Sequence, residues 1–267
     1  MKSIIPVASG KGGVGKSTVA VNLAIALAKT GAKVALIDAD LYGPSVPTLM
    51  GGGEHQIDHE GRLIPAEKYG VKYVSLGFFL PDPDEPVVWR GPMFTKALNQ
   101  LFNDVSWGEV DYCVVDMPPG TGDAQISLCQ MIQVSGVLMV TTPQEVALAD
   151  VRKAVNMFKK VNAPVWGIVE NMSGFTTPSG ESIAIFGEGG GAALAKKFSI
   201  PLLAQIPLDM EIRSGGDKGK PIVLDQKNAV AEQFMELALK VSTIVDKNQS
   251  EQPRVCLLYT SPSPRDS

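Results

Sequence analysis

The sequence predicts an α/β protein built on a doubly wound, mostly parallel sheet with helices on both faces. Three observations predict this fold: short apolar runs alternate with longer helical patterns, the links between them are short, and a glycine-rich loop follows the first run. Each right-handed crossover must pack its helix back onto the sheet, which places helices on both faces. A chain of 267 residues, 45% of them hydrophobic, can form one sizeable core of this kind.

The first strand, loop and helix lie at the start of the chain. Residues 3–9 (SIIPVAS) are short and apolar enough for a buried strand, and residues 17–29 (STVAVNLAIALAK) have the length and composition of a helix, which Gly31 ends. Between them, residues 10–18 (GKGGVGKST) match the phosphate-binding pattern G-x-x-x-x-G-K-[ST]. A strand, a glycine loop and a helix are the context that this pattern requires; a glycine-rich turn that binds nothing is the alternative.

The residue types of this loop suit the binding of ATP. Glycines let backbone N–H groups approach the phosphates, and the N-terminus of the helix adds the positive end of its dipole. We expect Lys16 to reach the β- and γ-phosphates as a catalytic group and Ser17 to ligate Mg²⁺. The predicted nucleotide contacts in this segment are Gly10, Lys11, Gly12, Gly13, Val14, Gly15, Lys16, Ser17 and Thr18.

Lys11 is a second lysine at the start of the same loop. It cannot easily fold back onto its own nucleotide, so we expect it to reach the phosphates held by a neighbouring subunit as a catalytic finger. In other phosphoryl-transfer systems a finger residue contributes about 10³ to 10⁵ in rate. The alternative is a solvated surface lysine.

The run KGGVGKST at residues 11–18 resembles the deviant Walker A motif of the MinD/ParA/Mrp class of dimeric P-loop ATPases. The resemblance covers residues 3–239, and DMPPGTGD at residues 116–123 is similar to switch II of the Mrp/ApbC branch in particular. It also includes FGEGGG at residues 186–191 and IPLD at residues 206–209. The resemblance implies a homodimer that hydrolyses ATP, with the first lysine acting across the subunits. It also implies that the protein assists iron–sulfur cluster assembly for apo-protein clients.

The next strand, predicted for residues 32–37, ends in two carboxylates, Asp38 and Asp40. Ligand sites form at the carboxyl ends of parallel strands, so these groups should lie beside the phosphates, where one could orient water or support Mg²⁺. The family resemblance implies water positioning by Asp40 and a supporting role for Asp38, whereas capping of the next turn is the alternative for either. The Gly- and Pro-rich residues 41–53 are predicted to form a loop that changes shape with nucleotide state.

Residues 54–86 show a weaker pattern, to which we assign no chemistry. The short runs 62–65 and 71–76 suggest a hairpin inserted at the surface. His55 and His59 have a spacing that could bind metal on a helix, but flanking glycines favour solvated loop histidines.

A helix is predicted to begin near Trp89 and Arg90 and to run through Phe102. An exposed Trp-Arg pair could anchor a partner protein; a tryptophan in the core is the alternative.

Residues 111–116 (DYCVVD) form the second predicted anchor of the site. An apolar run that ends in an acidic residue has the form of a Walker B strand, in which Asp116 would hold Mg²⁺ through water. Residues 118–123 (PPGTGD) are predicted to be a loop ordered by the γ-phosphate. Cys113, in this strand, and Cys129, in the following helix, are expected to be small buried hydrophobic residues.

Further alternation follows, with strands predicted for residues 136–141 and 164–170 and a helix for residues 146–161. Asn171 closes the last of these strands, and the family resemblance (VENMS) implies that its amide recognises adenine. A turn asparagine is the alternative reading. Pro207, in the IPLD segment, is expected to form a wall of the adenine pocket.

The sequence departs from its resemblance in the loop at residues 174–181, which reads GFTTPSGE. In Mrp-type carriers this loop commonly holds Cys-x-x-Cys, and two subunits share a cluster there. Iron–sulfur clusters need soft thiolate ligands, which hydroxyl and backbone groups cannot replace. The ATPase prediction stands, and cluster binding at this loop is in doubt.

Composition narrows the remaining possibilities. A net charge of −4 without a run of basic residues argues against a nucleic-acid partner. Apolar stretches too short for a bilayer and the absence of a signal pattern argue against a membrane and for the cytoplasm. Cys113, Cys129 and Cys256 form neither a disulfide framework nor a metal pair, so we expect a reducing compartment.

The predicted ATPase domain spans residues 1–247 and ends in a helix at residues 226–247. Residues 248–267 are read as a disordered or artefactual tail, of which residues 254–267 resemble readthrough sequence. The leading hypothesis is an Mrp-type ATPase that assists iron–sulfur cluster assembly. One alternative is a MinD/ParA-like positioning ATPase, which a basic amphipathic tail helix would favour; the lysines here, such as Lys240 and Lys247, are too few to form one. The other alternative is a nucleotide-dependent scaffold.

Overall fold

The structure is a computed structural model, and it describes residues 1–41, 43–54, 56–79, 91–177 and 179–251. A central sheet of the described residues has the strand order β12-β9-β8-β1-β7-β2-β6-β5. All neighbouring strands pair in parallel except β5, which is antiparallel to β6. The strands are β1 Ser3–Ser9, β2 Val34–Asp38, β5 Ala66–Lys68, β6 Val71–Ser75, β7 Tyr112–Asp116, β8 Val137–Thr141, β9 Val165–Asn171 and β12 Leu202–Ile206.

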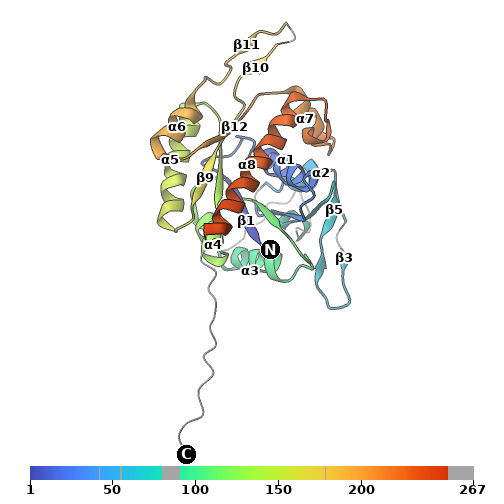
Figure 1. Ribbon diagram of the computed structural model, residues 1–267. Helices are drawn as coiled ribbons and strands as arrows, with labels where there is room; N and C mark the ends of the chain where they lie inside the picture. The colour runs from blue at the N-terminus through green and yellow to red at the C-terminus, as the bar shows by residue number, and fades with distance from the viewer. Residues whose placement is uncertain (42, 55, 80–90, 178, 252–267) are drawn as a thin grey trace, which may run out of the picture.

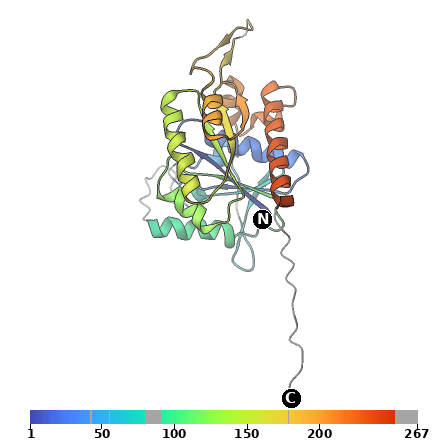
Figure 2. The same ribbon diagram turned by 60° about the vertical axis from the view of Figure 1, so that its left-hand side comes forward.

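Helices cover both faces of this sheet, as Figures 1 and 2 show from two directions. The side chains of α1 and α8 pack in one apolar cluster, and those of α3, α5 and α6 pack in a second cluster on the other face. The fold class predicted from the sequence is therefore confirmed. The helices are α1 Lys16–Lys29, α2 Val46–Met50, α3 Gly91–Asn103, α4 Asp123–Met131, α5 Glu145–Lys160, α6 Gly190–Phe198, α7 Met210–Asp217 and α8 Ala229–Glu251, with 3-10 turns at Leu76–Phe79 and Ile222–Leu224.

The central strands are apolar along their whole length because both faces of a parallel sheet are buried. In β2 every residue is buried, and in β8 every residue is buried too. Most of these strands end in a polar residue, and because the strands are parallel these ends meet at one edge of the sheet: Ser9, Asp38, Ser75, Asp116, Thr141 and Asn171. This edge carries the candidate site.

The prediction of a surface hairpin at residues 62–65 and 71–76 was wrong for its second part. β6 lies inside the central sheet, parallel to β2 with Val34 opposite Val71, and its residues are mostly buried. The surface hairpin is formed instead by β3 (Gln56–Ile57) and β4 (Leu63–Ile64). The alternation of apolar and polar residues in VKYVS is typical of a strand with one exposed face, but in the structure both faces of β6 are largely covered.

Two further differences concern loops and ends. The segment predicted as a loop at residues 41–53 contains the short helix α2. The terminal helix ends at Glu251, beyond the predicted end at residue 247. Trp89 and Arg90, predicted to anchor a partner with a core position of the tryptophan as the alternative, lie outside the described residues.

A second small sheet projects from the body of the molecule at the top of Figure 1. It is a hairpin of β10 (Phe175–Thr176) and β11 (Ser182–Ile183), which we call the projecting hairpin. Within the part of the chain that the structure describes, no helix is both long enough and apolar enough to cross a membrane.

Candidate functional site

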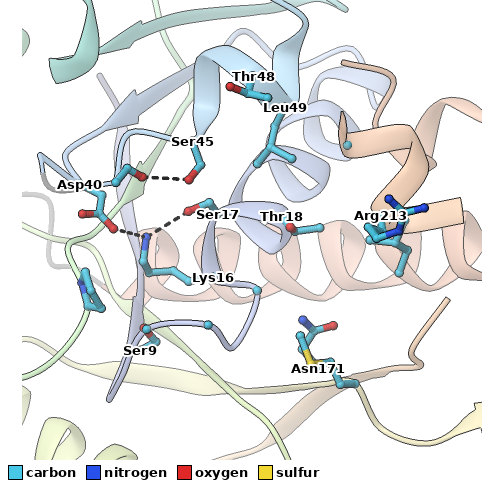
Figure 3. Close-up of a pocket in the computed structure, with 18 of the residues that line it drawn as sticks. Ser9, Lys16, Ser17, Thr18, Asp40, Ser45, Thr48, Leu49, Asn171 and Arg213 are labelled. Atoms are coloured by element: carbon cyan, nitrogen blue, oxygen red, sulfur yellow. Dashed lines mark hydrogen bonds and ion pairs between the residues drawn. The ribbon is translucent and has the colours of Figure 1, made fainter. Parts of the chain in front are cut away.

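A cavity of about 660 Å³ lies at the carboxyl edge of the sheet. The loop between β1 and α1 forms its floor, α2 and the residues before it form one wall, and the segment after β12 with α7 forms the opposite wall (Figure 3). Open parallel sheets bind their ligands at this edge, so the position agrees with the sequence prediction.

The loop between β1 and α1 depends on its glycines for different reasons. Gly13 and Gly15 have positive φ angles of 79° and 81°, and Gly15 is the N-cap of α1. A Cβ on Gly15 would lie 2.2 Å from Nδ2 of Asn171, whereas one on Gly12 or Gly13 would meet nothing within 4 Å. Gly10 does not line the cavity: its Cβ would lie 2.4 Å from the backbone of Asp150, so α5 packs directly against it.

Lys16 connects the loop to two acidic strand ends. Its side chain is 6% exposed, and Nζ lies 2.6 Å from Oδ1 of Asp116 and 3.4 Å from Oδ2 of Asp40. Nζ also donates to Oγ of Ser17 at 3.2 Å. Lys16, Ser17 and Asp40 therefore point toward one another at one end of the cavity, which we call the phosphate end (Figure 3).

Asp116 and Ser17 form a donor set that fits a magnesium ion. Asp116 is fully buried, and burial raises its pKa although the Lys16 ammonium opposes the shift. Its Oδ2 is buried without a hydrogen-bond partner among the described residues. A carboxylate oxygen left unsatisfied beside a hydroxyl is the hard oxygen chemistry that Mg²⁺ prefers.

Asp38 and Asp40 do different things although they are two residues apart. Asp38 is fully buried: Oδ1 accepts from the backbone N of Asp40, and Oδ2 accepts from the N of Val46 and from Oγ of Ser75. Burial and the nearby Asp116 raise the pKa of Asp38 to about 8. Asp38 does not line the cavity but holds the turn that presents Asp40 to it.

Lys11 lines the cavity and is half-buried. Its carbonyl accepts from Oγ of Ser9 at 2.9 Å, while its ammonium makes no hydrogen bond or ion pair within the described residues. Its action on a neighbouring subunit stays a prediction.

The opposite end of the cavity, which we call the base end, is more apolar. Met172, Pro207, Leu208 and Ile212 line it, together with the amide of Asn171. Nδ2 of Asn171 donates to the carbonyl of Val14 at 2.8 Å, which ties the base end to the phosphate-binding loop. Val14 takes part through its backbone, since its side chain is buried away from the cavity.

The wall formed by α7 was not predicted from the sequence. Arg213, Gly216 and Asp217 line the cavity from this helix, and Thr18 lies between Arg213 and Lys16 in Figure 3. Asp209 caps α7, because its Oδ1 accepts from the backbone N of Glu211 at 2.6 Å. An aspartate before a short helical stretch is the signal that could have found this helix.

The two walls are joined where the chain leaves α2 and α7. Gly219 has a φ of 63°, and a Cβ on it would lie 2.0 Å from Cα of Gly51. Tyr69 donates to the Gly219 carbonyl at 2.8 Å, and Lys68 donates to the Gly51 carbonyl at 3.1 Å. Only glycines allow two backbones to approach so closely.

The projecting hairpin is formed by the loop in which Mrp-type carriers commonly hold Cys-x-x-Cys. Its root is held by Glu170, a buried carboxylate that accepts from Oγ of Ser173 at 2.7 Å, from Nε2 of Gln205 at 2.9 Å and from the backbone N of Gly191. Thr177 and Glu181 close the tip with hydroxyl and backbone bonds.

The cysteines and histidines supply no metal site within the described residues, in which no group of three His, Cys, Asp or Glu side chains could hold an ion. Cys113 is buried as predicted, and burial raises its pKa to about 12. Cys129 is only partly buried, so that part of the prediction was wrong; burial still raises its pKa to about 11. His59 is exposed, as expected for a loop histidine, and His55 lies outside the described residues.

Strand, glycine loop and helix, with a lysine held between acidic strand ends, define a P-loop nucleoside triphosphatase fold and site. Comparison with known families makes this more specific. The model of the ParA family, described as NUBPL iron-transfer P-loop NTPase, matches residues 1–242. The chain belongs to this family.

Known relatives agree with this assignment. The iron–sulfur cluster carrier protein of Aquifex aeolicus is 51% identical over 250 residues, which are 92% of this chain and 69% of that protein. The nucleotide-binding protein of Archaeoglobus fulgidus, solved in complex with ADP, superimposes with a TM-score of 0.74 at 37% identity, over 87% of this chain and 91% of that one. The cell division ATPase MinD of Pyrococcus furiosus superimposes with a TM-score of 0.68 at 25% identity, over 91% of this chain and 100% of that one.

Proposed function

We propose that this protein is a dimeric, magnesium-dependent ATPase that assists the assembly of iron–sulfur clusters and their transfer to apo-proteins. The observation that carries the ATPase part is the group of Lys16, Ser17, Asp40 and Asp116 at the phosphate end of the cavity. The names of its relatives as iron–sulfur cluster carrier proteins support the role in assembly.

The chain's own residues suggest the steps of hydrolysis. Lys16 exchanges its ion pair with Asp116 for the β- and γ-phosphate oxygens, and its ammonium then stabilises the charge that develops on them. Asp40, fixed by the bond from its backbone to Asp38, orients the attacking water. Ser17 and Asp116 would hold Mg²⁺, which when bound neutralises phosphate charge.

Lys11 completes the site of a second subunit in this proposal, since it lines the cavity and its ammonium makes no hydrogen bond or ion pair within the described residues. Lys11→Ala should abolish ATP hydrolysis and leave ATP affinity within about twofold, because its contribution of roughly 10³ or more is made in the transition state. Steady-state hydrolysis and calorimetry measure the two quantities. Lys227→Ala, which removes an exposed lysine away from the cavity, is the matched control.

The oligomeric state tests the same proposal directly. Light scattering on the purified protein, with ATP bound and hydrolysis blocked, should show a dimer. A persistent monomer, or an equal loss of ATP affinity in Lys11→Ala, would contradict the action of Lys11 across subunits.

The cargo is tested separately from hydrolysis. The projecting hairpin contains no thiolate, so we expect anaerobic incubation with iron and sulfide to give no charge-transfer absorption from a cluster held there. A flat spectrum favours an assembly scaffold and leaves the ATPase intact. The absorption of a bound cluster would instead show that the protein is a carrier whose cluster ligands come from elsewhere in the chain.

A further inference from the structure

We propose that Arg213 stacks its guanidinium on the purine ring of the bound nucleotide, with Asp217 holding the guanidinium in position. The inference rests on the proposed function, because it assumes that a purine nucleotide occupies the cavity. It assigns a specificity role to α7, which has no part in the phosphate-binding motif.

The position of Arg213 places it at the base end of the cavity. It follows Ile212 on α7 and lies across Thr18 from Lys16 (Figure 3). Met172, Pro207 and Leu208 line the same cavity and are apolar. Apolar surfaces fit the flat face of a base and offer nothing to a phosphate group.

The charges around Arg213 also exclude a phosphate ligand. Its Nη1 lies 2.7 Å from Oδ2 of Asp217, and Asp209 lines the same end of the cavity. Two carboxylates against one guanidinium leave this end with a net negative charge, which repels phosphates and tolerates a neutral base. The phosphate end, in contrast, holds Lys16 and the N-terminus of α1.

The pair with Asp217 leaves the stacking surface available. A guanidinium is planar and can bond a carboxylate with its edge while its face covers an aromatic ring. Arg213 and Asp217 are four residues apart on α7, and their side chains are 75% and 65% exposed. Asp217 therefore bonds one edge of the guanidinium and leaves its face free for the base.

Calorimetry on the full chain with ATP, ADP and inorganic tripolyphosphate tests the inference. Arg213→Ala should weaken the binding of ATP and of ADP to the same extent, by about 5-fold to 20-fold. The affinity for tripolyphosphate should not change. Arg213→Lys should recover less than half of this loss on a logarithmic scale, because an ammonium cannot stack as a plane. Lys218→Ala, which removes a positive charge beside α7 but outside the cavity, should change none of the three affinities.

The possible outcomes separate this inference from the proposed function. Equal weakening of ATP and tripolyphosphate in Arg213→Ala would show that Arg213 acts through its charge and would overturn the stacking role. Unchanged ATP affinity would overturn it as well. A wild-type protein that fails to bind ATP would instead overturn the proposed function, and the inference with it.

Discussion

The two ends of the cavity are built in different ways. At the phosphate end, Lys16 and Asp116 are 6% and 0% exposed, and each side chain is held by its neighbours. At the base end, Arg213 is 75% exposed, and the walls are apolar surfaces from α7 and from the segments that follow β9 and β12. Charged phosphates require buried groups that are oriented in advance, whereas a flat base requires little more than matching surfaces.

The first variant tests the phosphate end. Lys16→Ala should lower ATP hydrolysis by about 10² to 10³ and weaken ATP and tripolyphosphate together, because Lys16 is the ammonium buried between Asp40 and Asp116. Hydrolysis assays and calorimetry measure these losses. Loss of ATP binding with tripolyphosphate binding unchanged would contradict the assignment of the two ends.

A second variant breaks the junction between the two walls. Gly219→Ala should lower the free energy of unfolding by about 2 to 4 kcal/mol, since a left-handed alanine costs about 1 kcal/mol and backbone overlap with Gly51 adds to it. Gly52→Ala is the matched control: Gly52 has a φ of 82° but open space at its Cβ, so only the first cost, about 1 kcal/mol, applies. Urea unfolding measures both, and equal losses would show that the crossing is not tight.

The third variant concerns Asn171, which belongs to both ends of the cavity. Asn171→Ala removes the bond to the Val14 carbonyl and a side chain that lines the base end. We expect the free energy of unfolding to fall by about 1 to 2 kcal/mol, and ATP and tripolyphosphate to bind more weakly, ATP by the larger factor. If tripolyphosphate affinity is unchanged in calorimetry, the bond to Val14 does not shape the phosphate loop.

The phosphate end could be predicted from the sequence because its residues are local. Lys16, Ser17 and the helix that they begin lie in one short segment. Asp116 ends an apolar run, and the composition of this run alone indicates a buried strand. The parallel sheet followed from the same alternation. Each of these signals is contained in about ten consecutive residues.

The rest depends on contacts between distant segments. β6 could not be distinguished from a surface strand, because its burial comes from β2 and from helices elsewhere in the chain. The wall formed by α7 meets α2 through Gly51 and Gly219, which are far apart in the sequence. Asp38 was expected near the nucleotide, and only the structure shows that its bonds to Val46 and Ser75 turn it inward.

The end of β9 gives the molecule one shared attachment point. Two adjacent residues there hold different parts: Asn171 holds the loop at Val14, and Glu170 holds the root of the projecting hairpin at Ser173 and the start of α6 at Gly191. The bond that anchors the phosphate-binding loop and the bonds that anchor the hairpin therefore start from neighbouring residues of one strand end. The segment that projects farthest from the body and the loop at its centre share this one point of attachment.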